Sequence, residues 1–150
     1  MSVHPIAAIL AGTPHRGPML LLDRLCGLVP GRYGRAVKAL SANESHQGGS
    51  EGKGGLPPSL LVDALGQLAI TVLSAGSRPR PRLWLLSALE DVRWDVLPRA
   101  GDLVEMEANV LRTWRGTSRV RVTASVKGTV RLRGVMVLTA GPEGASEIAA

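Results

Sequence analysis

The sequence is poor in aromatic residues and in cysteine. It has no Phe, one Tyr, three Trp and a single cysteine, Cys26, among 150 residues. Because single-stranded nucleic acids are commonly bound by stacking bases on aromatic side chains, so few aromatics argue against a nucleic-acid partner. One cysteine excludes an intrachain disulfide framework and a cysteine-rich zinc site. We therefore expect no bound metal, and a reducing compartment, the cytoplasm.

The sequence also lacks a convincing membrane-spanning run. The stretch 56–76 is long and apolar, but it contains Asp63, Gln67 and two prolines. A carboxylate in the middle of a membrane span is costly, so we expect no membrane span. Residues 2–12 have no basic segment before a short apolar run, which argues against a targeting sequence.

Basic residues outnumber acidic ones. Lys and Arg number 18 and Asp and Glu 12, which gives a net charge of +6, and this surface favours an acidic partner. Hydrophobic residues make up 45% and charged residues 20%, as in ordinary globular proteins. We find no internal repeat and no linker, so we expect one domain over 1–150 with a frayed tail from about 141.

Periodicity and turn residues predict an α+β fold. A short helix over 5–11 and a long helix over 58–75 are expected, with a glycine-rich loop between about 41 and 58. Strands are predicted over six ranges: 19–29, 33–42, 83–94, 102–114, 117–126 and 130–139. Tight turns are expected at Arg115-Gly116 and Lys127-Gly128. This order predicts an antiparallel sheet packed on one long helix.

The long helix carries a narrow polar stripe. Spacings of 4, 4, 4 and 3 residues place its polar side chains on one face, namely Ser59, Asp63, Gln67, Thr71 and Ser74. The rest is apolar, so we expect the helix to be central and buried on most sides. An unpaired carboxylate in such a helix is costly, which makes Asp63 the strongest candidate site residue.

Several motifs occur in the order typical of one family. They are Pro14-His15-Arg16, Pro18, Leu20-Leu21-Leu22-Asp23-Arg24, Asn43-Glu44, Leu56-Pro57, Asp63-Ala64-Leu65-Gly66-Gln67 and Ala100-Gly101-Asp102. Over about residues 5–139 the sequence resembles the hot-dog-fold 3-hydroxyacyl-[acyl carrier protein] dehydratases. The resemblance implies a curled antiparallel sheet wrapped around one long central helix, usually in a dimer. It implies a lyase of fatty-acid or polyketide-type synthesis.

The resemblance also implies site residues. In the family a histidine removes the proton α to the thioester, the helix carboxylate protonates the leaving hydroxyl, and the two come from different subunits. Asp63 matches the carboxylate, and Gln67, one turn later, is expected to orient its neighbours. The histidine position falls on Gly49, and the position of the glycine whose N–H binds the thioester oxygen falls on Pro58. His46, three residues before Gly49, is the candidate for a displaced base.

The same resemblance suggests partners. The substrate would arrive on the phosphopantetheine of an acyl carrier protein, so no separate cofactor is expected. Arginines near the exit of the long helix and the next strand could dock that acidic carrier, or could form a solvated basic edge: Arg78, Arg80, Arg82, Arg93 and Arg99. His15 belongs to a motif that is mostly structural in the family.

Three functions remain open from the sequence. The first is a dehydratase in which Asp63 is the acid. We expect such an enzyme to turn over slowly by itself, because loss of a positioned general base typically lowers the rate by about 10²–10⁴-fold. The second is a catalytically silent acyl-binding module or heterodimer partner, which would lend Asp63 to a subunit that has the histidine. The third is a hot-dog thioesterase in which Asp63 positions water.

Overall fold

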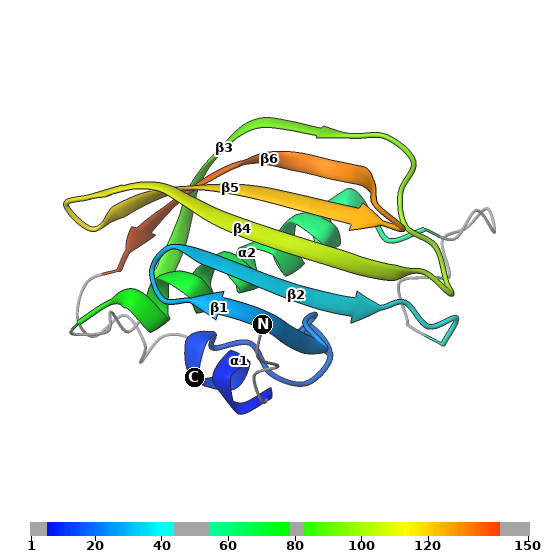
Figure 1. Ribbon diagram of the computed structural model, residues 1–150, viewed down its shortest axis with the longest axis horizontal. Helices are drawn as coiled ribbons and strands as arrows, with labels where there is room; N and C mark the ends of the chain where they lie inside the picture. The colour runs from blue at the N-terminus through cyan, green and yellow to red at the C-terminus, as the bar shows by residue number, and fades with distance from the viewer. Residues whose placement is uncertain (1–5, 44–54, 79–82, 142–150) are drawn as a thin grey trace.

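The computed structural model describes residues 6–43, 55–78 and 83–141. Within these ranges a six-stranded antiparallel sheet curls around a long helix, α2 (Pro58–Gly76), with a short helix, α1 (Ile6–Gly12), beside it (Figure 1). The strands are β1 (Arg24–Val29), β2 (Tyr33–Ala39), β3 (Trp84–Trp94), β4 (Leu103–Trp114), β5 (Thr117–Val126) and β6 (Thr129–Ala140). The predicted α+β hot-dog fold is confirmed.

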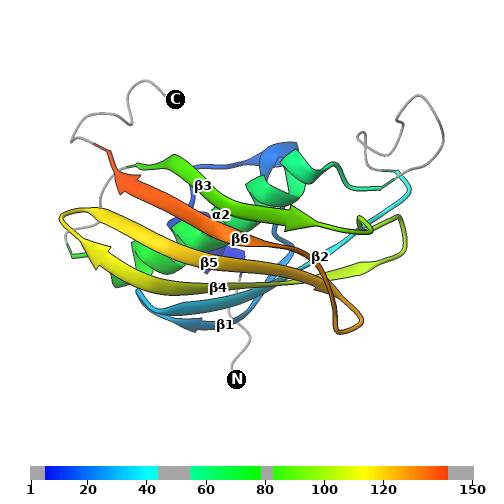
Figure 2. The ribbon, with the colours of Figure 1, turned by 90° about the horizontal axis from the view of Figure 1, so that it is seen from above.

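The strand order in the sheet is β1-β2-β4-β5-β6-β3. Each neighbouring pair is antiparallel, and β3 pairs with β6 although it precedes β4 in the chain. Seen from above in Figure 2, β3 therefore forms one edge of the sheet and β1 the other. The predicted tight turns at Arg115-Gly116 and Lys127-Gly128 are confirmed, since all four residues have positive φ, from 49° to 78°.

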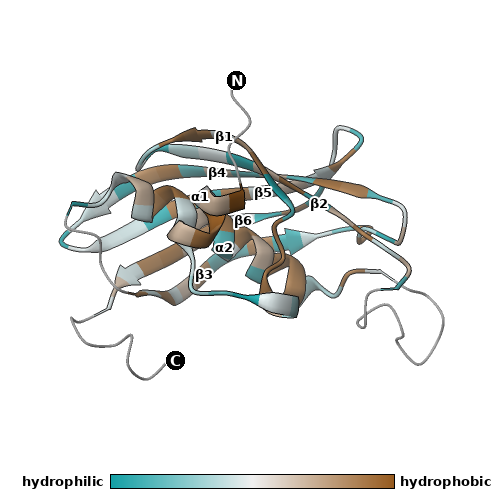
Figure 3. Ribbon diagram, turned by 90° about the horizontal axis from the view of Figure 1, so that it is seen from below, coloured by the Kyte–Doolittle hydropathy of each residue, from teal (hydrophilic) through white to brown (hydrophobic). Residues whose placement is uncertain are grey.

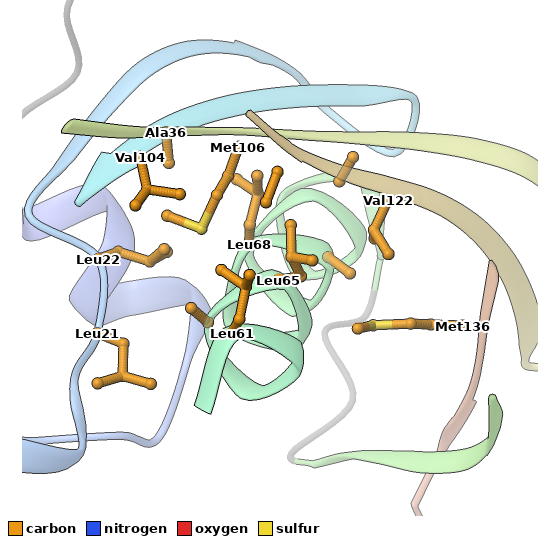
Figure 4. Packing of buried hydrophobic residues seen from close by; sticks show 14 of the residues in the cluster. Leu21, Leu22, Ala36, Leu61, Leu65, Leu68, Val104, Met106, Val122 and Met136 are labelled. Carbon is orange, nitrogen blue, oxygen red and sulfur yellow. The ribbon is translucent and has the colours of Figure 1, made fainter. Parts of the chain in front are cut away.

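The core lies between α2 and the concave face of the sheet. Leu61, Leu65 and Leu68 point from α2 toward Met106 and other residues of the sheet (Figure 4), and all four are fully buried. Strand β5 shows the alternation that was predicted, since Val120, Val122, Ala124 and Val126 are buried whereas Arg119 and Arg121 are exposed. More than half of the apolar window in α2, 56%, is buried inside the fold, as in the core helix of a globular domain.

The polar stripe of α2 faces the N-terminal part of the chain. The Ser74 hydroxyl donates to the Gly12 carbonyl at 3.1 Å, and the Gln67 side chain binds the backbone of residues 19 and 21. In Figure 3, which views the protein from below, the apolar helix α1 lies against α2. A Cβ on Gly12 would come within 2.8 Å of the Thr71 Cα, so this contact between the helices requires glycine.

Two predicted strand boundaries were wrong. Strand β2 ends at Ala39, three residues before the predicted end at 42. Residues 19–23 are not part of a strand, and β1 begins only at Arg24. Gly17–Met19 forms a 3₁₀ turn instead, in which the Leu20 N–H donates to the Gly17 carbonyl. The next backbone groups are bound by the Gln67 amide, so a side chain replaces the strand partner that the apolar run suggested.

Candidate active site

Asp63 lies on the second turn of α2, on its polar stripe. Its neighbours Ala64 and Leu65 are fully buried, but the Asp63 side chain keeps 37% of its surface exposed. The helix buries its apolar face against the sheet, which leaves this carboxylate at the boundary between the core and the N-terminal segment. A carboxylate there can be reached by a substrate without bearing the full cost of burial.

Gln67 is the most buried polar residue of the site, with no exposed surface. Its Oε1 accepts the Leu21 N–H at 2.9 Å, and its Nε2 donates to the Met19 carbonyl at 2.7 Å and to Asp63 Oδ2 at 3.3 Å. The amide is therefore fixed by two backbone groups, and one of its protons is directed at the carboxylate. Gln67 thus lies where the sequence predicted an orienting residue.

His15 approaches Asp63 from the N-terminal segment. The distance from His15 Nε2 to Asp63 Oδ1 is 3.9 Å, and the imidazole keeps 25% of its surface exposed. On the other side of the ring, Nδ1 lies 2.5 Å from Thr13 Oγ1, and Thr13 is 3% exposed. The resemblance implied a structural role for His15, and its place in Pro14-His15-Arg16, ahead of the apolar run, was the signal that could have pointed to it.

Most of the glycine-rich loop lies outside the described residues. His46 and Gly49 lie outside the described residues. Pro58 is the first residue of α2, and because proline has no N–H it offers no backbone donor there. The Leu56 N–H donates to the Pro98 carbonyl at 2.7 Å, so the chain entering α2 is tied to the segment after β3.

Among the arginines suggested as a docking surface, the three that the structure describes do not form one cluster. Arg80 and Arg82 lie outside the described residues. Arg78 follows the end of α2, whereas Arg99 forms a bridge with Gly55 just before the helix begins. The 19 residues of α2 span about 28 Å at 1.5 Å per residue, so these two arginines lie at opposite ends of the helix. Strand β3, which carries Arg93 near its C-terminal end, finishes at the same end of the sheet at which α2 begins (Figure 1).

One hollow in the described part of the chain is separate from Asp63. It has a volume of about 450 Å³ and lies where β3, β5 and β6 meet, on the outer face of the sheet, lined by Asp91, Arg93, Arg121, Thr123, Arg133, Gly134 and Val135. Arg93 pairs there with Asp91 at 3.3 Å, and both side chains are largely exposed. Within the described part of the chain, no group of three His, Cys, Asp or Glu side chains could hold a metal ion.

Comparison with curated proteins gives relatives that are named 3-hydroxyacyl-[acyl-carrier-protein] dehydratase FabZ. The chain is 34% identical over 135 residues to a 3-hydroxyacyl-[acyl-carrier-protein] dehydratase FabZ of Escherichia coli O9:H4 (strain HS), covering 88% of this chain and 89% of the relative. It is 33% identical, with the same coverage, to the protein of that name from Sodalis glossinidius (strain morsitans). No protein-family model matches the chain.

Solved structures share the fold at low identity. The dehydratase heterocomplex ApeI:P from Xenorhabdus doucetiae matches with a TM-score of 0.76 at 19% identity, over 94% of this chain and 95% of that one. A hypothetical thioesterase with coenzyme A from Streptococcus pneumoniae TIGR4 matches with a TM-score of 0.64 at 9% identity, over 78% and 84%. At these identities the likeness concerns the fold alone.

Proposed function

Because the chain belongs to the FabZ family of 3-hydroxyacyl-[acyl-carrier-protein] dehydratases, we propose that it removes water from 3-hydroxyacyl groups bound as thioesters to an acyl carrier protein. One observation carries the proposal: the half-exposed Asp63 carboxylate is oriented by the fully buried Gln67 amide. Asp63 acts as the acid that protonates the leaving hydroxyl. The phosphopantetheine arm of the carrier delivers the substrate, so the reaction needs no other cofactor, and it takes place in the cytoplasm.

The proposed turnover is slow compared with that of the relatives. Glycine at position 49 has no titratable group, and proline at position 58 has no N–H with which to bind the thioester oxygen. Loss of one oxyanion donor typically costs about 10²–10³-fold in turnover. The chain therefore works well below the rate of a family member that keeps the glycine.

The carrier protein docks near the beginning of α2. Arg93 and Arg99 lie at that end, and Asp63 is on the second turn of the same helix, so an acidic carrier bound there could deliver its arm to the carboxylate. Arg78 is at the far end of α2 and is not part of this surface in the proposal. Charge attraction of this kind mainly accelerates encounter, and salt weakens it.

The proposal includes pairing of two subunits through β3. This edge strand has eleven residues and exposes Leu85, Leu86, Leu89 and Trp94 by 47–54%. An exposed, apolar edge of this length favours pairing with another strand. Sedimentation velocity should show a dimer that Leu89→Lys dissociates, whereas Val29→Lys, on the opposite edge, should leave it intact. A monomeric wild type would contradict the pairing.

The enzymatic proposal is tested by mass spectrometry of a 3-hydroxyacyl carrier-protein thioester. The wild type should lose water slowly, and Asp63→Asn should lower turnover by at least about 10²-fold, because the amide cannot donate the proton. Asp95→Asn, an exposed carboxylate after β3, is the matched control and should match the wild type. Equal turnover by wild type and Asp63→Asn would refute the role of Asp63.

The same samples distinguish the two alternatives. Release of free acid and thiol, without water loss, would identify a thioesterase. The heterodimer alternative draws support from the fold shared with the ApeI:P heterocomplex. It predicts an inactive wild type that restores turnover when mixed with a family member whose own helix carboxylate has been replaced.

A further inference from the structure

The His15 ring is held at both nitrogens. Nδ1 lies 2.5 Å from Thr13 Oγ1, which also accepts the His15 backbone N–H at 3.3 Å. Nε2 faces Asp63 Oδ1 at 3.9 Å. Since Thr13 is buried whereas His15 and Asp63 are both partly exposed, the ring is positioned from the interior and its reactive edge remains accessible. An imidazole held in this way can accept or donate a proton at its exposed nitrogen, Nε2.

The segment that carries His15 is itself fixed. The Arg16 guanidinium donates to the carbonyls of Leu10 and Thr13, each at 2.8 Å, and so closes the turn after α1. Downstream, Gln67 holds the backbone of residues 19 and 21 against α2. The approach of His15 to Asp63 is therefore determined by hydrogen bonds on both sides of the histidine.

We propose that His15 is the general base of this chain, and that it works with Asp63 of the same chain. The inference rests on the proposed dehydratase function and deepens it. The resemblance places the family's histidine position on Gly49, and His15 is the imidazole that the described structure places beside Asp63. The base and the acid then come from one subunit, and neither is borrowed from a partner.

The step balances without a further reactant. His15 donates Nδ1–H to Thr13 Oγ1, and its Nε2 lone pair takes the proton from Cα of the acyl chain. The electrons of that C–H bond form the Cα=Cβ double bond, and the Cβ–O bond breaks. The leaving hydroxyl takes the proton of the Asp63 carboxyl and departs as water. The imidazolium then returns its proton to Asp63, directly or through one water molecule, across the 3.9 Å between Nε2 and Oδ1.

Two reactions of the full-length protein separate the base from the acid. The first is dehydration of a 3-hydroxyacyl carrier-protein thioester. The second is exchange of the α-protons of a saturated acyl thioester with D₂O, followed by mass spectrometry. The saturated chain has no leaving hydroxyl, so exchange needs a base and no acid. Loss of the acid should therefore lower dehydration alone, whereas loss of the base should lower both reactions.

The three histidines of the sequence supply matched variants. His15→Gln should lower both reactions by at least about 10²-fold, because glutamine keeps a polar side chain but cannot accept the proton. Asp63→Asn should lower dehydration by a similar factor and leave exchange within a few fold of wild type. His4→Gln is the control for loss of an imidazole. Thr13→Val keeps His15 but removes its Nδ1 partner, and should lower exchange by less than His15→Gln does.

The outcomes discriminate between the two proposals. Dehydration that survives in His15→Gln but is lost in Asp63→Asn would overturn His15 as the base and leave the dehydratase function standing. Loss of both reactions in His46→Gln, with His15→Gln active, would assign the base to His46. A wild type that catalyses neither reaction would refute both proposals. Should His15→Gln fail to fold, as judged by circular dichroism, the Thr13→Val result decides, and unchanged exchange in that variant would contradict the inference.

Discussion

Replacing Gln67 by leucine tests whether one buried amide holds the N-terminal segment on α2. The substitution preserves size but removes hydrogen bonds to the Leu21 N–H at 2.9 Å, the Met19 carbonyl at 2.7 Å and Asp63 Oδ2 at 3.3 Å. The leucine cannot replace any of them. The N–H of the buried Leu21 is then left without a partner inside the protein.

The magnitude follows from the burial of each group. A buried donor without a partner costs about 1–3 kcal/mol. Met19 is 55% exposed, so water can replace the lost bond to its carbonyl at little cost. Asp63 is likewise partly exposed and can be hydrated. We therefore expect the free energy of unfolding to fall by about 2 kcal/mol, dominated by the Leu21 N–H.

Urea unfolding followed by circular dichroism measures this loss. With a slope of about 2 kcal/mol per molar, the midpoint should move down by about 1 M at unchanged slope. Thr71→Val is the matched control on the same stripe. The Thr71 hydroxyl donates to the Gln67 carbonyl, which also accepts a helical hydrogen bond, so its loss should cost at most about 1 kcal/mol. Equal midpoints for the two variants would refute the reasoning.

Two further predictions concern stability. Gly76→Ala should destabilise the fold by more than about 1 kcal/mol, because the new Cβ would lie 2.3 Å from the Gly31 Cα. Gly66→Ala should instead stabilise α2 by about 0.5–1 kcal/mol, because the new Cβ would have no contact closer than 4.0 Å. Thermal unfolding of the two variants measures these changes, and a Gly66→Ala variant less stable than the wild type would contradict the prediction. Burial, and then the charge of Glu107, raise the pKa of Tyr33 above its usual value of 10.0. The folded state thus holds the Tyr33 proton more tightly than the unfolded state, so the free energy of unfolding falls as the pH rises through that pKa. Tyr33→Phe should reduce this alkaline loss of stability, which urea midpoints measured from pH 8 to 11 would show.

The sequence could predict elements whose signal is local. The long helix was predicted to begin at position 58, as it does, because prolines precede an apolar run with one polar stripe. Strand β5 was predicted within its observed bounds, because its side chains alternate strictly between the two faces of the sheet. The wrong boundary at residue 19 has a non-local cause, since a glutamine 46 to 48 residues later binds the backbone there.

The residues of the candidate site likewise fall into those that a local pattern predicted and those that only the fold brought together. By itself the sequence determined that Asp63 and Gln67 share one face of an apolar helix, because helical periodicity fixes which side chains align. Only the tertiary structure decided that His15, 48 positions before Asp63, faces that carboxylate, and that β3 is at the edge of the sheet beside β6. Both depend on which distant segments pack together. That choice is made by the burial of apolar surface and the pairing of backbone groups over the whole fold, and no local pattern encodes it.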